Sequence, residues 1–530
     1  QEFRFATCDN PPRLLWTRPT TTNSACRHRG PLEPPTMKGT GAKIFDLEGA
    51  SDKRIRISDV VESLGFGPFQ VSMFFLTSAA TNFCDGLEIV VLNSISVATA
   101  AEFDISPVHR GMLSTMVFLG FCAGCFTSGC TGDGFGRRLP IVTGLGLMSF
   151  CSAATGLCDS FSAVVAYRTA MGFFMGLAYT PALAVVSELT PTNSRMLMRV
   201  VGHIAFALGA GSAGLLLSTE DPTLQSLAWR RLAMIVAVPP LMWTMFSASL
   251  MPESPVFLAS TGDRPGALRG FAAMKALNRA TNAVIDFAPA HPSTSGDGSP
   301  GPLAVCFSRR FRMIIVVATY VLLCANLVKY GHNYAAPQIF PQTSLIPAAW
   351  NLTIMQGWSV LTGVATLVAS RRLSRASLMT AGLLITSSAL LAFVVAASYP
   401  TEDASWTAAA WGFYGRNFIQ VGADVNFITV VQVAVEGFPT VASATGAGII
   451  LGASRLGAAF SPVMFEKLRV VTGSWSSYYE LMLAMNIFGV VLMVLFRRSF
   501  NGLEGAYEGD RSTESLVLRA APSRTQAEMA

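Results

Sequence analysis

Hydrophobic positions along the chain gather in stretches that are long enough to cross a membrane. A membrane-spanning helix needs about 20 mostly apolar residues. Stretches that meet this condition begin near residues 70, 109, 139, 161, 200 and 227, and again near 311, 351, 376, 407, 444 and 476. The pattern therefore predicts an all-α membrane protein with about twelve transmembrane helices in two sets of six.

Polar segments flank and separate these two sets. Residues 1–67 are polar, basic and rich in proline, which is typical of a disordered tail. The segment between the sets holds a predicted amphipathic helix at about 264–279 and a Ser/Gly/Pro run at 293–302, which indicates a linker. We expect five regions: a disordered cytoplasmic tail (1–67), a first six-helix half (68–252), a cytoplasmic linker (253–310), a second six-helix half (311–498) and a second cytoplasmic tail (499–530).

The composition supports a chain surrounded by lipid. Hydrophobic residues make up 51% of the sequence, charged residues only 13%, and the mean hydropathy is +0.46, whereas soluble domains carry about 25% charged residues. The net charge of +6 lies in tails and loops, without the basic stripe and interleaved aromatics of a nucleic-acid-binding protein. We expect a lipid bilayer and no nucleic acid as partners.

No pattern of reactive residues indicates an enzyme. The ten cysteines show no metal-ligand spacing and no disulfide framework. The sequence holds no nucleophile–base pair, metal cluster or phosphate-binding loop. We expect no enzymatic activity, no cofactor and no metal.

Basic residues concentrate in alternate loops, which predicts the orientation of the chain. Arg137–Arg138 and Arg371–Arg372 fall in one set of loops, whereas Glu102 and Asp104 fall in the other. Positive loops face the cytoplasm, so we expect both ends of the chain on the cytoplasmic side.

The two halves share one spacing of charged residues. An Arg, a Glu 20 residues later and a Pro 3 residues after the Glu occur in both halves, as Arg168, Glu188 and Pro191 and as Arg416, Glu436 and Pro439. Duplicated six-helix halves are a known transporter architecture, with the binding site between the halves near the middle of the membrane.

The loop after the second apolar stretch carries a recognisable signature. Its sequence, Gly129-Cys-Thr-Gly-Asp133-Gly-Phe-Gly136-Arg137-Arg138, resembles the G-x-x-x-D-x-x-G-R-R motif of the major facilitator superfamily. Further matches to one branch lie at Leu64–Gln70, Asp85–Glu88, Pro252–Pro255 and Lys329–Gly331. Over about residues 60–498 the chain resembles the synaptic-vesicle-glycoprotein-related and organic ion transporters, close to proton-coupled metabolite symporters.

The resemblance implies a major facilitator fold and secondary active transport by alternating access. The expected partner is a small organic solute, an organic ion or metabolite, with protons as a candidate coupling ion, and the expected working unit is a monomer. A transport-inactive receptor or scaffold of the same fold is an alternative. A sugar transporter is another, although the paired glutamines that sugar porters carry in the seventh span are absent.

Ionisable residues inside apolar spans are costly, at roughly 2.5–3.5 kcal/mol each, and therefore mark a candidate site. Asp85 in the first span and Arg168 in the fourth match the coupling pair of proton-coupled sugar relatives. A fixed structural ion pair is the alternative. Glu88 lies one turn from Asp85 and shares its face, so it is a candidate for a solute contact or for the proton site, with a packing contact as the alternative.

The second half supplies further candidates. Asn326, Lys329 and Tyr330 share one stripe of the seventh span, where Lys329 either lines the site or extends to the membrane surface. Arg416, Gln420 and Asp424 are spaced by four on the tenth span. Arg416 is a candidate partner for a solute carboxylate, and an arrangement with Asp424 through Gln420 is the alternative.

The resemblance also implies a gate at the cytoplasmic ends of the helices. Its expected residues are Asp133, Arg137, Arg138, Glu188 and Arg195 in the first half and Glu436 and Arg455 in the second half. Solvated interface charges are the alternative for this group.

Overall fold

The computed structural model describes residues 57–287, 302–397, 406–438 and 440–500. Every regular element in these ranges is a helix. The main helices are α3 (Ala80–Glu102), α4 (Pro107–Phe135), α5 (Arg138–Thr155), α6 (Phe161–Leu189), α7 (Arg195–Glu220), α8 (Trp229–Val236), α9 (Val238–Leu250), α13 (Arg312–Thr343), α14 (Ala348–Ala369), α15 (Arg375–Ala397), α16 (Trp406–Glu436), α17 (Thr440–Thr472) and α18 (Ser476–Phe500).

The helices begin close to the positions that the hydrophobic pattern predicts. Ten segments are long and apolar enough to cross a membrane within the described ranges, among them Pro68–Glu102, which joins α2 (Pro68–Phe74), the π-helical η2 (Phe75–Ala79) and α3 into one rod. Two further long helices complete the predicted twelve. One is α5, which has only 18 residues and starts with an arginine. The other is α16, whose polar side chains Arg416, Asn417, Gln420, Asp424 and Asn426 are buried inside the protein.

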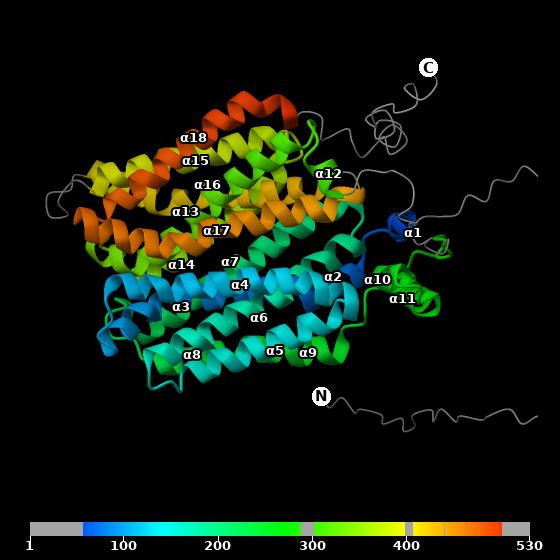
Figure 1. The fold of residues 1–530 in the computed structure, drawn as a ribbon, viewed down its shortest axis with the longest axis horizontal. Coiled ribbons are helices and arrows are strands. Elements are labelled where there is room, and N and C mark those ends of the chain that lie inside the picture. The colour runs from blue at the N-terminus through cyan, green and yellow to red at the C-terminus, as the bar shows by residue number, and fades with distance from the viewer. Residues whose placement is uncertain (1–56, 288–301, 398–405, 439, 501–530) are drawn as a thin grey trace, which may run out of the picture. The chain divides into compact units, whose positions relative to one another are not determined.

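Figure 1 shows two groups of helices, α3–α9 on one side and α13–α18 on the other. Between them, α7 packs against α14 and α4 packs against α17. The outer faces are apolar, because large side chains such as Phe150, Met245, Leu361 and Leu495 are more than half exposed. This distribution is that of an integral, multi-pass membrane protein.

Glycines spaced by four hold α4 and α6 at close range. A methyl group on Gly120 or Gly124 of α4 would lie 2.3 or 2.0 Å from a carbonyl oxygen of α6. A methyl group on Gly172 or Gly176 of α6 would lie 2.2 Å from a carbonyl oxygen of α4. Small residues at this spacing let two membrane helices bring their backbones together. The close contact fixes the position of α6, which carries the Arg168 side chain.

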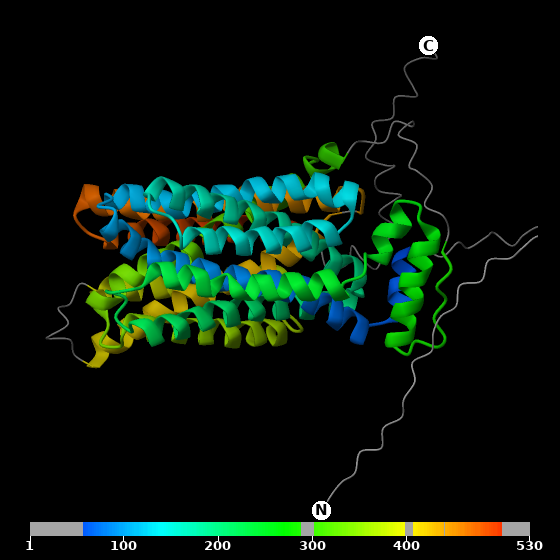
Figure 2. The same ribbon diagram turned by 90° about the horizontal axis from the view of Figure 1, so that it is seen from below.

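Short helices gather at one end of the bundle, which we name the α11 end (Figures 1 and 2). They are α1 (Ile57–Leu64), α10 (Pro255–Ser260), α11 (Arg264–Leu277) and α12 (Pro302–Cys306). The amphipathic helix predicted at about 264–279 is α11. The opposite end, which we name the far end, carries the connections at 103–106, 156–160, 221–228, 344–347 and 473–475.

Residues 57–64, which the sequence analysis places in a disordered tail, form α1 instead. Val60, Val61 and Leu64 are buried, and Glu62 accepts hydrogen bonds from the backbone N–H (2.8 Å) and the hydroxyl (2.5 Å) of Thr192. Three buried apolar side chains are enough to pack this short helix against the protein. The sequence analysis missed the helix because the residues before it are mostly polar. Residues 1–56 and 501–530 of the expected tails, and 288–301 of the expected linker, lie outside the described ranges.

Candidate functional site

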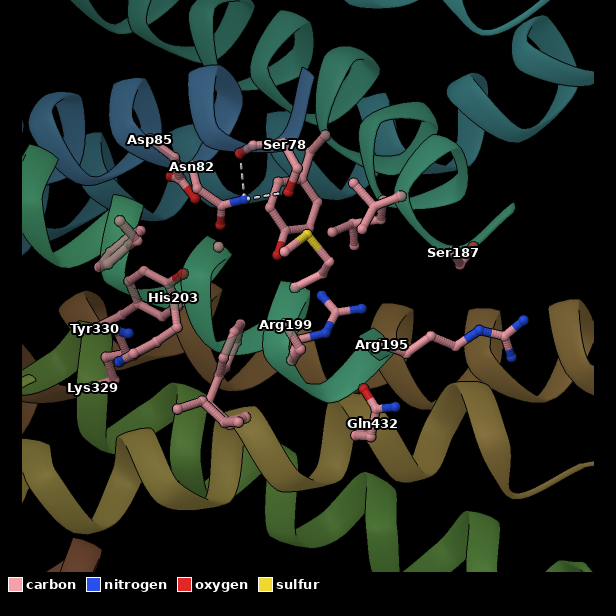
Figure 3. Close-up of a pocket in the computed structure, with 18 residues that line it drawn as sticks. Ser78, Asn82, Asp85, Ser187, Arg195, Arg199, His203, Lys329, Tyr330 and Gln432 are labelled. Carbon is pink, nitrogen blue, oxygen red and sulfur yellow. Dashed lines mark hydrogen bonds between the residues drawn. The ribbon is translucent and has the colours of Figure 1, made fainter. Parts of the chain in front are cut away.

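A cavity that is partly open to solvent lies between the two groups of helices (Figure 3). Asp85, His203 and Lys329 lie toward one side of it, in the middle of the bundle. Ser187 and Arg195 lie toward the other side, next to the α6–α7 connection at the α11 end. The wall is completed by further polar and apolar side chains: Ser78, Asn82, Tyr179, Leu183, Val186, Met198, Arg199, Gly202, Phe206, Tyr330, Phe427, Ile428 and Gln432.

Arg168 pairs with Glu88 rather than with Asp85, so the expected Asp85–Arg168 pair is wrong. Arg168 Nη1 lies 2.8 Å from Glu88 Oε2, and both side chains are fully buried. Asp85 lies one turn away and lines the cavity. Its Oδ1 atom is buried without a hydrogen-bond partner in the described part of the chain. Two adjacent carboxylates therefore differ in role, one closed in an ion pair and one facing the cavity.

Lys329 does not extend to the membrane surface. Its ammonium lies 2.9 Å from Asp424 Oδ1. Asp424 Oδ2 accepts a hydrogen bond from Ser359 Oγ at 2.5 Å and lies 3.5 Å from His203 Nε2. All four side chains are buried. We name these four residues the Lys329 cluster; three come from the second group of helices, and His203 comes from α7 of the first.

The remaining second-half candidates on α16 and α13, which are Arg416, Gln420 and Asn326, are not among the residues that line the cavity. Arg416 Nη1 donates to the carbonyl oxygen of Thr343 at 2.9 Å, near the far end, and not to Gln420 or Asp424. Gln420 accepts a hydrogen bond from Asn333 at 2.9 Å. Asn326 donates to Ser454 Oγ and to its carbonyl oxygen, both at 3.2 Å. These residues make hydrogen bonds within the second group of helices and do not form the cavity surface.

Arg455 lies in the middle of the protein and not at the expected gate. It is 15 residues into α17, which is roughly 22 Å along the helix axis. Its guanidinium lies over the rings of Phe121 and Tyr179, at 4.6 and 5.4 Å from their centroids, and Nη1 donates to Tyr330 Oη at 3.0 Å. Arg455 therefore sits behind the cavity wall, where cation–π contacts stabilise it.

At the α11 end, the structure brings several of the expected gate residues together. Arg137 Nη2 lies 3.0 Å from Glu188 Oε1, and Glu188 Oε2 accepts a hydrogen bond from Ser254 Oγ at 2.7 Å. Arg138 donates to the carbonyl oxygen of Ala248. Arg195 Nε donates to the carbonyl oxygen of Thr190 at 3.2 Å, which closes the end of α6. The side chains of two further expected members, Asp133 and Glu436, lie outside the described part of the chain.

Glu253 holds the start of α5 in place. Its two carboxylate oxygens accept hydrogen bonds from the backbone N–H groups of Arg137 (2.8 Å) and Arg138 (3.2 Å). Gly136 makes this contact possible, because its φ of +92° suits glycine and a methyl group there would lie 2.3 Å from Glu253 Oε2. The first N–H groups of a helix lack partners within the helix. An acid from another segment therefore caps α5 and links its start to the α9–α10 connection.

We expect Glu253→Ala to destabilise the protein by about 1–2 kcal/mol, because capping and helix-dipole contacts contribute energies of this size. The effect is measured by thermal unfolding of the detergent-purified protein, in which size-exclusion chromatography reports how much folded protein remains after heating. Glu253→Gln keeps one acceptor oxygen and serves as the matched control, with a smaller loss. Equal melting temperatures for Glu253→Ala and the unchanged protein would contradict the capping role.

A charged network at the far end joins the two groups of helices, and sequence reasoning missed it. Glu466 of α17 is fully buried and accepts hydrogen bonds from Arg110 of α4 (Nη2, 2.7 Å), from Tyr334 (2.6 Å) and from Gln338 (3.1 Å). Arg469 also donates to Gln338 at 2.9 Å. The available signal was an acid and an arginine at the ends of apolar stretches, and only the packing of α4 on α17 shows that they meet.

Within the described ranges, no three His, Cys, Asp or Glu side chains converge in a way that could hold a metal ion. Cys122 and Cys125 are not joined in a disulfide. The chemistry that the arrangement offers is ion pairing and hydrogen bonding around a central cavity.

Comparisons with known proteins agree with this architecture. Residues 73–505 match the family described as sugar (and other) transporters. The svop-1 protein of Caenorhabditis elegans is 28% identical over 250 residues, 47% of each chain. The synaptic vesicle 2-related protein of Xenopus laevis is 25% identical over 450 residues, 79% of this chain and 77% of that one. The chain thus matches about half the length of the first of these relatives.

A solved structure shows the same fold. It is that of the proton:xylose symporter XylE of E. coli, a major facilitator superfamily protein, bound to 6-bromo-6-deoxy-D-glucose. The two share a TM-score of 0.62 and 18% identity, over 81% of this chain and 96% of that chain. Together with the match over residues 73–505, this shows that the chain has the major facilitator fold and belongs to the sugar (and other) transporter family.

Proposed function

We propose that the protein is a secondary active transporter that moves a small organic solute across a membrane by alternating access. One observation carries the proposal: a central cavity lined by both groups of helices reaches toward the α11 end, while Arg110 and Glu466 join the same two groups at the far end. A site that is reachable from one side and closed on the other is what alternating access requires. The halves at 68–252 and 311–498 are the units that rock against each other, within a monomer.

The same proposal places the α11 end in the cytoplasm. Basic side chains concentrate there, including Arg137, Arg138, Arg195, Arg371 and Arg372, and positive residues favour the cytoplasmic side of a membrane. The two ends of the chain then both lie in the cytoplasm, and the cavity faces inward. Arg137, Arg138, Glu188 and Arg195 act as the cytoplasmic gate, together with Asp133.

Proton coupling is supported by the Glu88–Arg168 pair. A proton on Glu88 removes the charge that holds Arg168, and the freed guanidinium then needs a new partner. Asp85 lies one turn away on the same helix and lines the cavity. Exchange of Arg168 between Glu88 and Asp85 would connect proton binding to the shape of the cavity.

Flux through reconstituted protein tests the transport function. Proteoliposomes with an inside-alkaline pH gradient are offered labelled organic anions, organic cations and sugars in turn. We expect saturable uptake of one class that a protonophore slows. Saturable binding without flux would favour a receptor instead, and uptake confined to xylose or glucose would favour the sugar transporter that the family description also covers.

A further inference from the structure

The Lys329 cluster differs from a fixed ion pair in that only one of its two charged partners lines the cavity. Lys329 lines the cavity, whereas Asp424, its partner at 2.9 Å, lies behind it and is fully buried. The ammonium therefore stands between an internal carboxylate and the space that a solute would occupy. A bound anion and Asp424 would compete for the same cation.

His203 offers a place for the proton that decides this competition. Its Nε2 atom is buried without a hydrogen-bond partner in the described chain and lies 3.5 Å from Asp424 Oδ2. An added proton on Nε2 would create an N–H donor directed at that carboxylate, with no other bond made or broken. Asp424 would then be neutralised by an imidazolium, and Lys329 would be available to the cavity.

The surroundings of Lys329 favour an anion with an apolar body. Its ammonium lies 4.2 Å from the ring centroid of Phe206 and 5.1 Å from that of Phe427, and both rings line the cavity. Three basic side chains, Arg195, Arg199 and Lys329, line the cavity together with one carboxylate, Asp85.

Other charged groups face the cluster from the neighbouring helices. They are Asp85 on α3 and Arg455 on α17, and these two act on each other electrostatically. Their opposite charges partly offset each other, and Lys329 is the cation of the cluster that faces the cavity.

We propose that Lys329 binds a carboxylate, or another singly anionic group, of an amphipathic organic solute, and that Asp424 and His203 form the proton site that frees Lys329 to do so. This rests on the proposed transport function and gives it a substrate class. One proton enters the cluster with each anionic charge that binds, so the two events together add no net charge at the Lys329 cluster. Because His203 and Asp424 belong to different groups of helices, the same proton also draws the two groups together around the solute.

Binding to the full-length protein in lipid nanodiscs tests the proposal without requiring flux. The probes are benzoate, neutral benzamide and cationic benzylammonium, titrated to about 10 mM at about pH 6 and about pH 8. We expect benzoate to bind about tenfold or more tightly than benzamide at the lower pH, as charge-assisted hydrogen bonds allow. At the higher pH benzoate weakens and benzamide does not change.

Three variants and one control locate the effect. Lys329→Gln removes the preference for benzoate, and Asp424→Asn makes benzoate binding strong at both pH values. The double variant Lys329→Gln/Asp424→Asn keeps a neutral, hydrogen-bonded pair in the protein interior, so it folds and also shows no preference. Lys275→Gln, which changes a lysine on α11, keeps the preference.

Other results overturn the proposal. Benzamide or benzylammonium binding as well as benzoate, a preference that survives Lys329→Gln, or no binding of any probe would each do so. Uptake of organic cations in the proteoliposome experiment would leave the transport function standing and reject the anion site. Binding of benzoate as described, with no flux of any solute, would reject transport and keep the site.

Discussion

Replacing Arg168 with leucine is expected to destabilise the protein by about 3–5 kcal/mol and to abolish solute flux, because it leaves the Glu88 carboxylate buried without a cation. Both side chains of this pair are fully buried, and the two charged atoms are 2.8 Å apart. Thermal unfolding in detergent and uptake into proteoliposomes measure the two effects. The loss is large because the Glu88 carboxylate stays buried after its partner, the Arg168 guanidinium, has been removed.

Two comparisons separate stability from function in this experiment. The double variant Glu88→Gln/Arg168→Gln removes both charges, so most of the stability should return while proton-driven uptake stays absent. Glu102→Gln breaks an exposed pair with Arg230, whose side chains are 41% and 38% exposed, and should cost no more than about 1 kcal/mol. An Arg168→Leu protein that melts like the unchanged one would contradict the buried-pair account.

Sequence reasoning alone could not predict that Arg168 pairs with Glu88 and not with Asp85. Composition and apolar length are enough to place the spans, since a bilayer sets the length of every helix. The partner of Arg168 depends on helix rotation instead. Asp85 and Glu88 are three residues apart, which separates them by about 60° around the axis. The π-helical segment η2 (Phe75–Ala79) precedes both and rotates everything after it relative to a continuous α-helix.

The repeat between the halves predicts where charged residues lie along the helices better than it predicts which groups they contact. Arg168 and Arg416 occupy the same place in the repeated spacing, yet Arg168 meets Glu88 whereas Arg416 donates to a backbone oxygen at Thr343. The sequence of α13 contains no Asp or Glu, so Arg416 finds no carboxylate on that helix. The predicted gate position of Arg455 is wrong for a related reason. The spacing of residues in the sequence does not show how far along α17, and therefore how deep in the protein, this side chain lies. The four residues of the Lys329 cluster come from four different helices, so the cluster can be recognised only once the packing of those helices is known.

Replacing Glu466 with glutamine is expected to open the far end of the protein. The carboxylate accepts hydrogen bonds from Arg110, Tyr334 and Gln338, and an amide keeps the shape but loses the charge. Hydrogen bonds to a charged group contribute about 1.5–3 kcal/mol, so the equilibrium between the two access states should shift about tenfold or more toward the state open at the far end.

Cysteine labelling measures this shift. Thr115 lies one turn after Gly111, the position where α4 approaches Pro462 of α17, and only 6% of its surface is exposed. A Thr115→Cys protein should react slowly with a membrane-impermeant maleimide added from the far side, and about tenfold or more faster when it also carries Glu466→Gln. Labelling of the native cysteines is subtracted with protein that lacks Thr115→Cys.

The matched control is Glu102→Gln, which removes an acid at the same end. Glu102 pairs with Arg230, and both belong to the first group of helices, so this pair does not tie the two groups together. Its loss should leave the labelling rate of Thr115→Cys unchanged. If Glu466→Gln also left the rate unchanged while the protein stayed folded, the far-end network would be a structural contact and not the closure that alternating access must break. A faster rate with Glu466→Gln alone means that one buried carboxylate sets which side of the membrane the cavity faces.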